Sequence, residues 1–489
     1  MNNSSLIEVL KTFSKSDTKE FDKFLKARFF GTDNIIYKLY KTLAKYHPEF
    51  PEEKIVKEEI FKIIYNGKKI NPSLMRKNIS ILLKCIDEYF LQLSTGKLER
   101  LTNICLLEEY RVRNLNKQYN VKYKEIKAKL FTDQKVESDI FFSLLNFEIE
   151  SASSLILLNK REQAETAIKR EYEFFMYMLF DKIENHFSHK QMYAQVNKNF
   201  STIMDKAFLP NFNYDGFIKS LGTDETEYGF LIKIFYYSYK CYQDIGNYEN
   251  YRMLKKLIFD NYSKLDDYYK HAFLFRLTSI TTPFDGNPKY SGDRNFYLKT
   301  VIRNKYFKLH FNYLQVSVFL ESFYASLRVD DNEFAEELLK IHINEVSEDF
   351  RENLYNFCMC GYLIHKKKFK EALSYNVKVK KELIQYKKML QIYLFEIYYA
   401  LNYYDNAFST LESLKYFVAS EKKLGDNIKK MYNDYYYFAK KILEIKTGSN
   451  SAKEIKSKAE LLLSELLPLK DIADRLRLST KLKELINSK

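Results

Sequence analysis

Two cysteines and a histidine lie close together near the middle of the second half of the chain, at Cys358, Cys360 and His365. Thiolate and imidazole groups are the usual ligands of zinc. On a helix, however, residues i and i+2 point about 200° apart, so both thiols cannot easily reach one ion. Cys358 also falls in a row of apolar positions. We therefore expect these thiols to be buried apolar side chains, not metal ligands.

A second candidate is the pair His186 and His189, which would share one helical face with Glu184 nearby. Two ligands at this spacing could bind a metal ion. No third or fourth ligand is evident from the sequence. We expect a surface or interhelical pair instead, and we predict neither a metal site nor a cofactor.

The sequence contains no recognisable catalytic motif. The chain has 12 glycines, and they form no phosphate-cradling loop and no nucleophile elbow. Carboxylates are abundant but scattered, so no acid–base pair can be nominated. The sequence therefore predicts a protein that is not an enzyme, for which a small-molecule substrate is not expected.

The segment from His365 to Lys388 holds nine lysines against two glutamates, with Phe369, Tyr375 and Tyr386 interleaved. Lysines neutralise phosphates and aromatic rings can stack on bases, but lysines also suit solvated helix faces. Lys117–Lys129 has the same ambiguity, whereas Asp330–Glu352 is acidic, an alternation that suits selective protein partners. The candidate partner-binding residues are Lys366, Lys367, Lys368, Lys378, Lys380, Lys381 and Arg294, the last at the end of a predicted loop.

Composition limits the architecture that can present these residues. The 489 residues include only 12 Gly and 7 Pro, and 46% are hydrophobic, which indicates helices joined by short loops. The net charge of +15 fits a nucleic-acid or anionic partner, but the codon usage of an AT-rich genome produces the same excess of lysine.

The N-terminal segment, the apolar runs and the cysteines indicate where the protein is located. The N-terminus lacks the features of a signal peptide, and the densest apolar run, Phe174 to Phe180, is too short to span a bilayer. Five scattered cysteines make no disulfide framework. We therefore expect a cytoplasmic protein without a membrane span.

The strongest pattern is a repeat of 35 residues across 316–420, in which Phe334, Phe369 and Tyr404 match in phase. Each unit places apolar residues along one helical face, then a short polar turn, then a second helix. Such a unit cannot bury its face alone, so consecutive units must stack. Gly246-Asn247-Tyr248 indicates an earlier copy of the turn.

The predicted organisation follows. We expect an N-terminal helical domain over 1–93, a helical bundle or irregular helix pairs over 94–210, a superhelix over 227–420 with an insertion loop at 281–294, and capping helices over 421–489. Particular elements are also predicted: a helix capped by Ser16 or Asp17, a helix opened by Asn71-Pro72, one helix over 98–130, a turn at Asn159-Lys160-Arg161, and helices over 426–445, 452–467 and 469–486.

The repeat resembles tetratricopeptide (TPR) repeats through Tyr362, Phe369 and Ala372, and again through Leu394, Tyr398, Tyr404 and Ala407. The aromatic residue usual early in the first helix is replaced by Glu321, Asn356 and Gln391. The N-terminal block resembles a poorly characterised family of large helical bacterial proteins through Phe21–Phe30, Lys57–Ile64 and Leu74–Arg76, and the end resembles it through Leu467–Lys470.

These resemblances imply an all-α protein built as an α-solenoid of TPR-like helix pairs, preceded by the N-terminal helical domain. They bring no known reaction with them. We expect a non-catalytic scaffold or adaptor that binds a protein or peptide on a concave surface. A nucleic-acid-associated protein using lysine-rich helical faces is the alternative.

Overall fold

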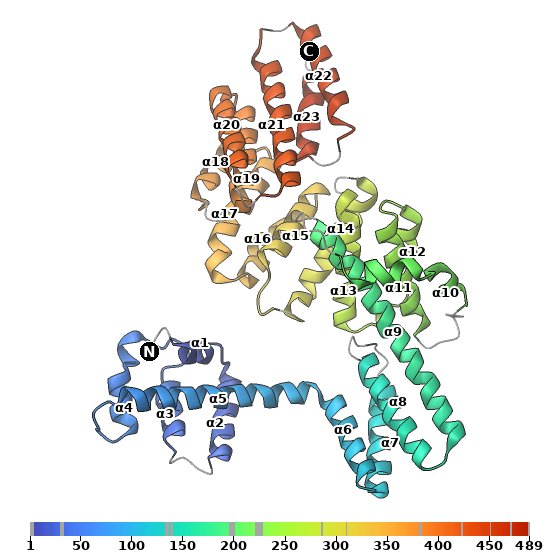
Figure 1. The fold of residues 1–489 in the computed structure, drawn as a ribbon. Coiled ribbons are helices and arrows are strands. Elements are labelled where there is room, and N and C mark those ends of the chain that lie inside the picture. Colours follow the sequence, from blue (N-terminus) through green and yellow to red (C-terminus); the bar gives the residue numbers. More distant parts are fainter. Residues whose placement is uncertain are drawn as a thin grey trace. The chain divides into compact units, whose positions relative to one another are not determined.

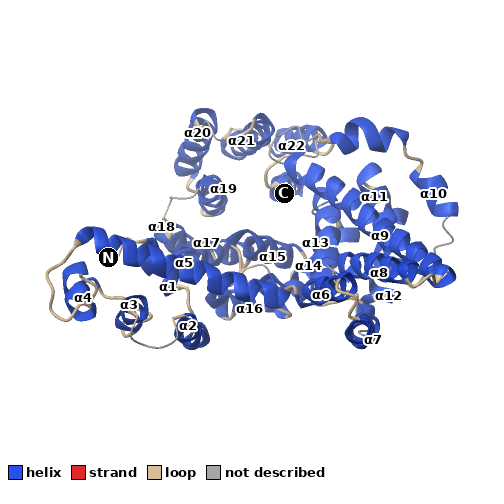
Figure 2. Cartoon of the chain, turned by 60° about the horizontal axis from the view of Figure 1, so that its bottom comes forward, coloured by secondary structure: helices blue, strands red, loops and turns tan. Residues whose placement is uncertain are grey.

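The protein is all-α, as predicted, in the computed structural model (Figures 1 and 2). The structure describes residues 4–29, 34–132, 136, 140–194, 201–220, 228–284, 287–309, 311–380, 384–421, 424–449, 451–469 and 472–487. Within those ranges the regular elements are helices, and the only β-type pairings are two isolated bridges, Val136 with Leu265 and Leu314 with Val346.

The first α-helices in chain order are α1 (Ser5–Lys11), α2 (Lys15–Arg28), α3 (Ile35–Ala44), α4 (Lys57–Ile64), α5 (Pro72–Lys97), α6 (Glu99–Val112), α7 (Asn116–Thr132), α8 (Ile140–Leu157) and α9 (Arg161–Ala194). The others are α10 (Tyr214–Ser220), α11 (Gly229–Gln243), α12 (Tyr248–Asp260), α13 (Asp267–Thr281), α14 (Pro288–Arg303), α15 (Val316–Arg328), α16 (Asn332–Lys340), α17 (Glu348–His365), α18 (Phe369–Lys378), α19 (Ile384–Ala400), α20 (Tyr404–Ser420), α21 (Asp426–Thr447), α22 (Ala452–Leu466) and α23 (Arg475–Asn487). Shorter pieces are η1 (Glu52–Lys54), the π-helix η2 (Met204–Phe208), η3 (Leu209–Asn211), η4 (Tyr262–Lys264), η5 (Thr282–Phe284), η6 (Tyr306–Leu309) and η7 (His342–Glu345).

The chain divides into two compact units. Unit 1 comprises Met1–Leu130 and Asn146–Ala167, and unit 2 comprises Phe131–Leu145 and Ile168–Lys489. The predicted boundary at residue 93 therefore falls inside helix α5, and the predicted segment 94–210 contributes to both units.

Helices α1 to α5 of unit 1 enclose one apolar core, in which Phe21 and Leu25 are fully buried. Helix α2 is capped by Ser14, not by Ser16 or Asp17 as predicted. The Ser14 hydroxyl accepts from the Asp17 backbone N–H at 3.1 Å, and the Asp17 carboxylate accepts from the Ser14 N–H at 2.8 Å. Asp17 is thus the third helical residue of a capping box. The predicted start at Asn71-Pro72 is confirmed, because the Asn71 side chain accepts from the Leu74 N–H at 3.0 Å.

The single helix predicted over 98–130 is wrong, since the structure has α6 and α7 there with a turn between them. Asn114 adopts φ of 57°, and the Leu115 N–H reaches back to the Tyr110 carbonyl at 2.8 Å. Asparagine tolerates this left-handed conformation and so ends a helix as glycine does. The turn predicted at Asn159 is confirmed between α8 and α9 and has the same geometry, with φ of 55°.

Helix α8 is long and apolar enough, by composition alone, to cross a membrane, and it is the one described helix that meets this test. Of its residues, 56% are buried inside the fold. It also carries Glu150, whose carboxylate pairs with Arg111 at 2.8 Å. Burial of this kind is what the core helix of a globular protein requires, so its apolar character has a packing explanation.

Helices of unit 2 follow one another as antiparallel pairs: α11 with α12, α13 with α14, α15 with α16, α17 with α18, and α19 with α20 (Figure 1). Among the first helices, α11 contacts α13, α15 contacts α17, and α17 contacts α19. The second helices α12, α14, α16 and α18 each contact the first helix that follows them. Helices α21, α22 and α23 continue the packing from α20. The helices predicted over 426–445 and 452–467 are present as α21 and α22, whereas α23 begins only at Arg475.

The turns within three of these pairs, α15–α16, α17–α18 and α19–α20, share one conformation. Asp330, Lys367 and Asn402 have φ between 57° and 59°. In each turn the next N–H bonds to the carbonyl five residues earlier, at 2.8 to 2.9 Å, which closes the first helix. Gly246, with φ of 105°, occupies the turn predicted before α12.

The insertion loop predicted over 281–294 is wrong. Helix α13 runs to Thr281 and helix α14 begins at Pro288, so the connection is short. The Asn287 side chain caps α14 by accepting from the Lys289 N–H at 3.0 Å, with Pro288 at the first helical position. This Asn-Pro pair is the same start signal as Asn71-Pro72, and the sequence interpretation missed it because glycines surround it.

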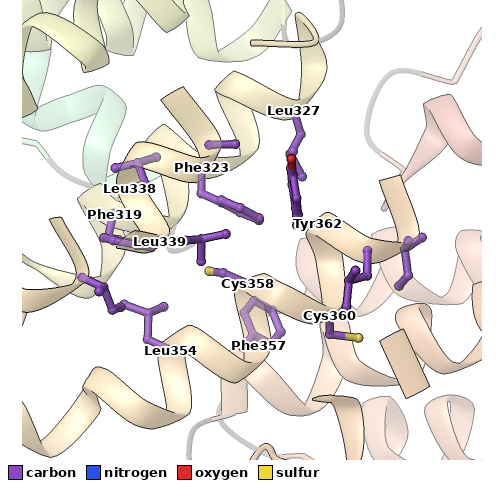
Figure 3. Packing of buried hydrophobic residues seen from close by; sticks show 14 of the residues in the cluster. Phe319, Phe323, Leu327, Leu338, Leu339, Leu354, Phe357, Cys358, Cys360 and Tyr362 are labelled. Carbon is purple, nitrogen blue, oxygen red and sulfur yellow. The ribbon is translucent and has the colours of Figure 1, made fainter. Parts of the chain in front are cut away.

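The apolar rows of the repeat form the core of the pairs. Phe323, Cys358 and Tyr393, which occupy equivalent positions in successive units, are all fully buried. Figure 3 shows α15, α16 and α17 contributing side chains to this cluster, with Cys358 among them. Ala372 and Ala407 are also fully buried, at the positions where the second helix must approach closely.

Candidate functional site

The lysines predicted to bind a partner lie on the α17–α18 pair, at two separate places. Lys366, Lys367 and Lys368 form the turn before α18, and Lys378 and Lys380 lie at its far end. Lys368 and Lys378 are ten residues apart along the chain, which corresponds to about 15 Å on a helix. All five side chains are exposed. Lys381 lies outside the described residues.

Two of these lysines lie against tyrosine rings. The ammonium group of Lys366 is 5.4 Å from the Tyr362 ring centre, and that of Lys378 is 5.0 Å from the Tyr375 ring centre. Lys368 is 3.6 Å from Glu371, an exposed ion pair of small energetic value. The far end of α18 is held by Asn353, which accepts from the Lys380 N–H at 2.7 Å.

Arg294, the remaining predicted partner-binding residue, is not on a surface. Its side chain lies on α14, is almost entirely buried, and pairs with Glu321 of α15 at 2.6 Å. Its prediction as a loop residue was wrong because residues 288–303 are helical. Arg294 is a structural link between two helix pairs.

The thiols of Cys358 and Cys360 are buried on α17, as expected. Burial raises the pKa of Cys358 well above its usual value and that of Cys360 to about 12. The side-chain amide of Asn376 points at the Cys360 sulfur at 3.8 Å. Neutral thiols are poor metal ligands and poor nucleophiles, so this pair behaves as core.

The two histidines of α9 point into different surroundings. His186 is buried, with its Nε2 3.0 Å from an Asp205 oxygen, whereas His189 is exposed. Glu184 instead forms a buried ion pair with Arg276 of α13. In the part of the chain that the structure describes, no group of three His, Cys, Asp or Glu side chains is placed to share a metal ion.

His186 and Asp205 lie next to Thr202, so the three side chains are of the types found in catalytic triads. The Thr202 hydroxyl is 3.4 Å from His186 Nδ1, a long contact for a hydrogen bond. The same hydroxyl accepts from the Met204 N–H at 3.1 Å, and Asp205 accepts from the Thr202 N–H at 3.0 Å. These bonds join Thr202 to the first residues of η2, which gives the trio a structural role.

Asp205 is charged in this arrangement. Burial raises its pKa, but hydrogen bonds from Lys190, from the Thr202 N–H and from His186 outweigh this and hold the pKa well below its usual range. The carboxylate therefore ties η2 to α9.

A polar cluster between α19 and α23 was not anticipated from the sequence. The ammonium group of Lys481 lies 2.8 Å from Glu396, and both side chains are buried. Arg477, one turn earlier on α23, lies 5.7 Å from the Tyr393 ring centre. The sequence signal for this cluster is a basic pair at i and i+4, beside the buried Leu478 and Leu482. The cluster fastens α23 to α19.

Helix α13 exposes two aromatic side chains that the sequence analysis also did not single out. Tyr268 and Phe275 are 41% and 49% exposed and are seven residues apart, so they lie on one helical face. His271, between them, has its ring 6.2 Å from that of Phe275. Exposed aromatic residues at this spacing are typical anchors of protein interfaces.

The chain matches no protein-family model, no curated protein and no solved structure.

Proposed function

We propose that unit 2 is an α-solenoid of TPR-like helix pairs, and that its concave face is formed by the first helices α11, α13, α15, α17 and α19. The support is the pattern of helix contacts: α11 contacts α13, α15 contacts α17, and α17 contacts α19, while α14 contacts α15 and so joins the two sets. The left-handed turn residue common to the last three pairs and the in-phase buried rows also support it. Stacked pairs of this kind build extended binding surfaces.

The proposed function is that of a non-catalytic scaffold or adaptor for a protein or peptide partner. The observation that carries it is the exposed aromatic face of α13, formed by Tyr268 and Phe275. An exposed phenylalanine on a packed helix costs free energy in water, and burial against a partner recovers it. Aromatic side chains also supply large contact areas with few rotatable bonds.

At the α19 end, the same face is occupied by the chain itself. Lys481 of α23 lies 4.3 Å from the Tyr399 ring centre in addition to its pair with Glu396. The part of the first-helix face that this proposal assigns to a partner is therefore α13, which carries the exposed Tyr268 and Phe275.

The test is affinity capture from native cell extract, with and without nuclease treatment, comparing the wild type with two variants of the full chain. Phe275→Ser removes an aromatic residue from a first helix, and Phe296→Ser removes one of equal exposure (50%) from the second helix α14. A protein retained by the wild type and by Phe296→Ser, and lost by Phe275→Ser, supports the proposal. Bound material that disappears with nuclease favours nucleic acid and contradicts it.

A further inference from the structure

We propose a second binding surface, on helix α18, for an extended acidic segment of a protein partner. Lys370, Ser374 and Lys378 follow one another at intervals of four residues, so they lie along one face of the helix. All three are exposed. This surface is distinct from the one in the proposed function, because α18 is the second helix of its pair, whereas α13 is the first helix of another pair.

The lysines of this surface are not neutralised by the protein itself. Of the six exposed lysines between 366 and 380, only Lys368 lies within ion-pair distance of a carboxylate among the described residues. The positive field is therefore available to a partner.

The surface is also pre-organised. The Lys368 N–H bonds to the Leu363 carbonyl at 2.8 Å, which fixes the turn, and Asn353 bonds to the backbone of Lys380 at the other end. The contact of Lys378 with the Tyr375 ring restricts its stem. A lysine already ordered loses less conformational entropy when it binds.

The spacing selects the conformation of the partner. Lys370 and Lys378 are eight residues apart, which is about 12 Å along the helix. In an extended peptide, residues i and i+4 point to the same side and lie about 13 Å apart. Carboxylates at i, i+2 and i+4 of an extended segment therefore match the stripe, with Ser374 opposite the middle position.

Nucleic acid fits this surface less well. Single strands gain affinity by stacking bases on aromatic rings, but the rings of Tyr362 and Tyr375 are already covered by Lys366 and Lys378. A stripe about 12 Å long also meets few phosphates, and phosphate neutralisation supplies most of non-specific affinity.

The experiment measures binding of a fluorescein-labelled peptide of twelve residues with Glu at every second position and Ser between them. Full-length protein is titrated at about 150 mM salt, where distant charges are screened. The test variant is Lys370→Glu with Lys378→Glu. The matched control is Lys124→Glu with Lys127→Glu on α7, which changes net charge equally and removes two exposed lysines, one of them likewise stacked on a tyrosine.

We expect the α18 variant to weaken peptide binding about tenfold or more and the α7 variant to change it less than about twofold. Equal weakening by both variants would overturn the proposal, because it would reduce the effect to net charge. A dT20 oligonucleotide that binds more tightly than the peptide, and is lost by the α18 reversal, would also overturn it. Neither result touches the Phe275 comparison, so the two proposals fail separately.

Discussion

The hydroxyl of Tyr393 donates a hydrogen bond to the hydroxyl of Tyr324 at 3.1 Å, across 69 residues of sequence. Tyr393 lies on α19 and Tyr324 on α15, so the bond joins helix pairs that are separated by the α17–α18 pair. The Tyr393 side chain passes directly over Gly361 of α17. Three first helices are thus held together at one point, and the absence of a side chain at residue 361 makes this possible.

Gly361→Ala is therefore expected to destabilise unit 2. The added Cβ would lie 2.5 Å from the Tyr393 hydroxyl oxygen, which is fully buried and cannot move freely. Overpacking of this kind costs about 1–3 kcal/mol. Chemical denaturation measures the loss. Adding Tyr393→Phe removes the clashing oxygen, so the double variant should lose less than the sum of the two single losses. Simple additivity would show that the two residues are not coupled.

The buried pair of Arg276 and Glu184 gives a second expectation. Burial raises the pKa of Glu184 to about 7, against the lowering effect of the Arg276 charge. Arg276→Met leaves this carboxyl buried without its partner and should destabilise the protein by about 3–5 kcal/mol. Arg276→Met combined with Glu184→Leu should recover much of the loss, because no buried charge then remains. A double variant no more stable than Arg276→Met, measured by thermal unfolding, would contradict this.

Acid should weaken the ion pairs that join α16 and η7 to Arg303 and Lys305 at the end of α14. His342 lies with one ring nitrogen 3.0 Å from Glu337 and the other 2.8 Å from Glu345. Hydrogen bonding to Arg303 holds the pKa of Glu337 below its usual 4.5. For Glu345, burial raises the pKa, but hydrogen bonds from Lys305 and His342 lower it by more, so the net shift of this pKa is also downward.

A carboxyl whose pKa is depressed in the folded state stabilises the fold above its unfolded pKa, and this contribution is lost as pH falls below about 4.5. The free energy of unfolding of Glu337→Gln with Glu345→Gln should be lower than that of the wild type at pH 7. It should also fall less steeply between about pH 5 and pH 3. Parallel pH profiles for the two proteins would show that the carboxyls contribute nothing there.

Lys367 carries the left-handed turn of the α17–α18 pair, with φ of 58°. Lys367→Gly removes the steric cost of this conformation and should raise stability by a few tenths of a kcal/mol up to about 1 kcal/mol. Lys367→Val should lower it, because a β-branched residue fits this region poorly. The control is Lys370→Gly, in the first turn of α18, which should be destabilising because glycine loses more backbone entropy there than lysine does. A destabilised Lys367→Gly protein in thermal unfolding would contradict the assignment of the turn.

The parts of the fold that depend on local pattern could be predicted from sequence. Helical class, the start at Asn71-Pro72 and the turn before Tyr248 follow from spacing and capping residues, and the structure has all three. The errors at Asn114 and Asn287 are also local: an asparagine in the left-handed conformation and an Asn-Pro cap were not recognised. Because the helix start at Asn287-Pro288 was missed, Arg294 was predicted to be a surface residue of a loop, although its side chain is buried.

The remaining features depend on contacts between distant segments. Nothing near Lys481 in sequence indicates that it pairs with Glu396, and nothing near Glu184 indicates Arg276. The exposure of a side chain also depends on distant segments. Phe273 is buried because it packs against Phe235 of α11, whereas Phe275, two residues later on the same helix, is exposed. Periodicity places a residue on a helix face, but packing decides which face is covered.

The most direct test of the proposed scaffold function is the affinity of a captured protein partner, once purified, for the wild type, Phe275→Ser and Phe296→Ser. An aromatic anchor at an interface centre contributes about 2 kcal/mol or more. We therefore predict that Phe275→Ser weakens binding roughly thirtyfold, while Phe296→Ser leaves it within about twofold. Equal affinity of all three proteins for that partner would contradict the assignment of the first-helix face as the binding surface.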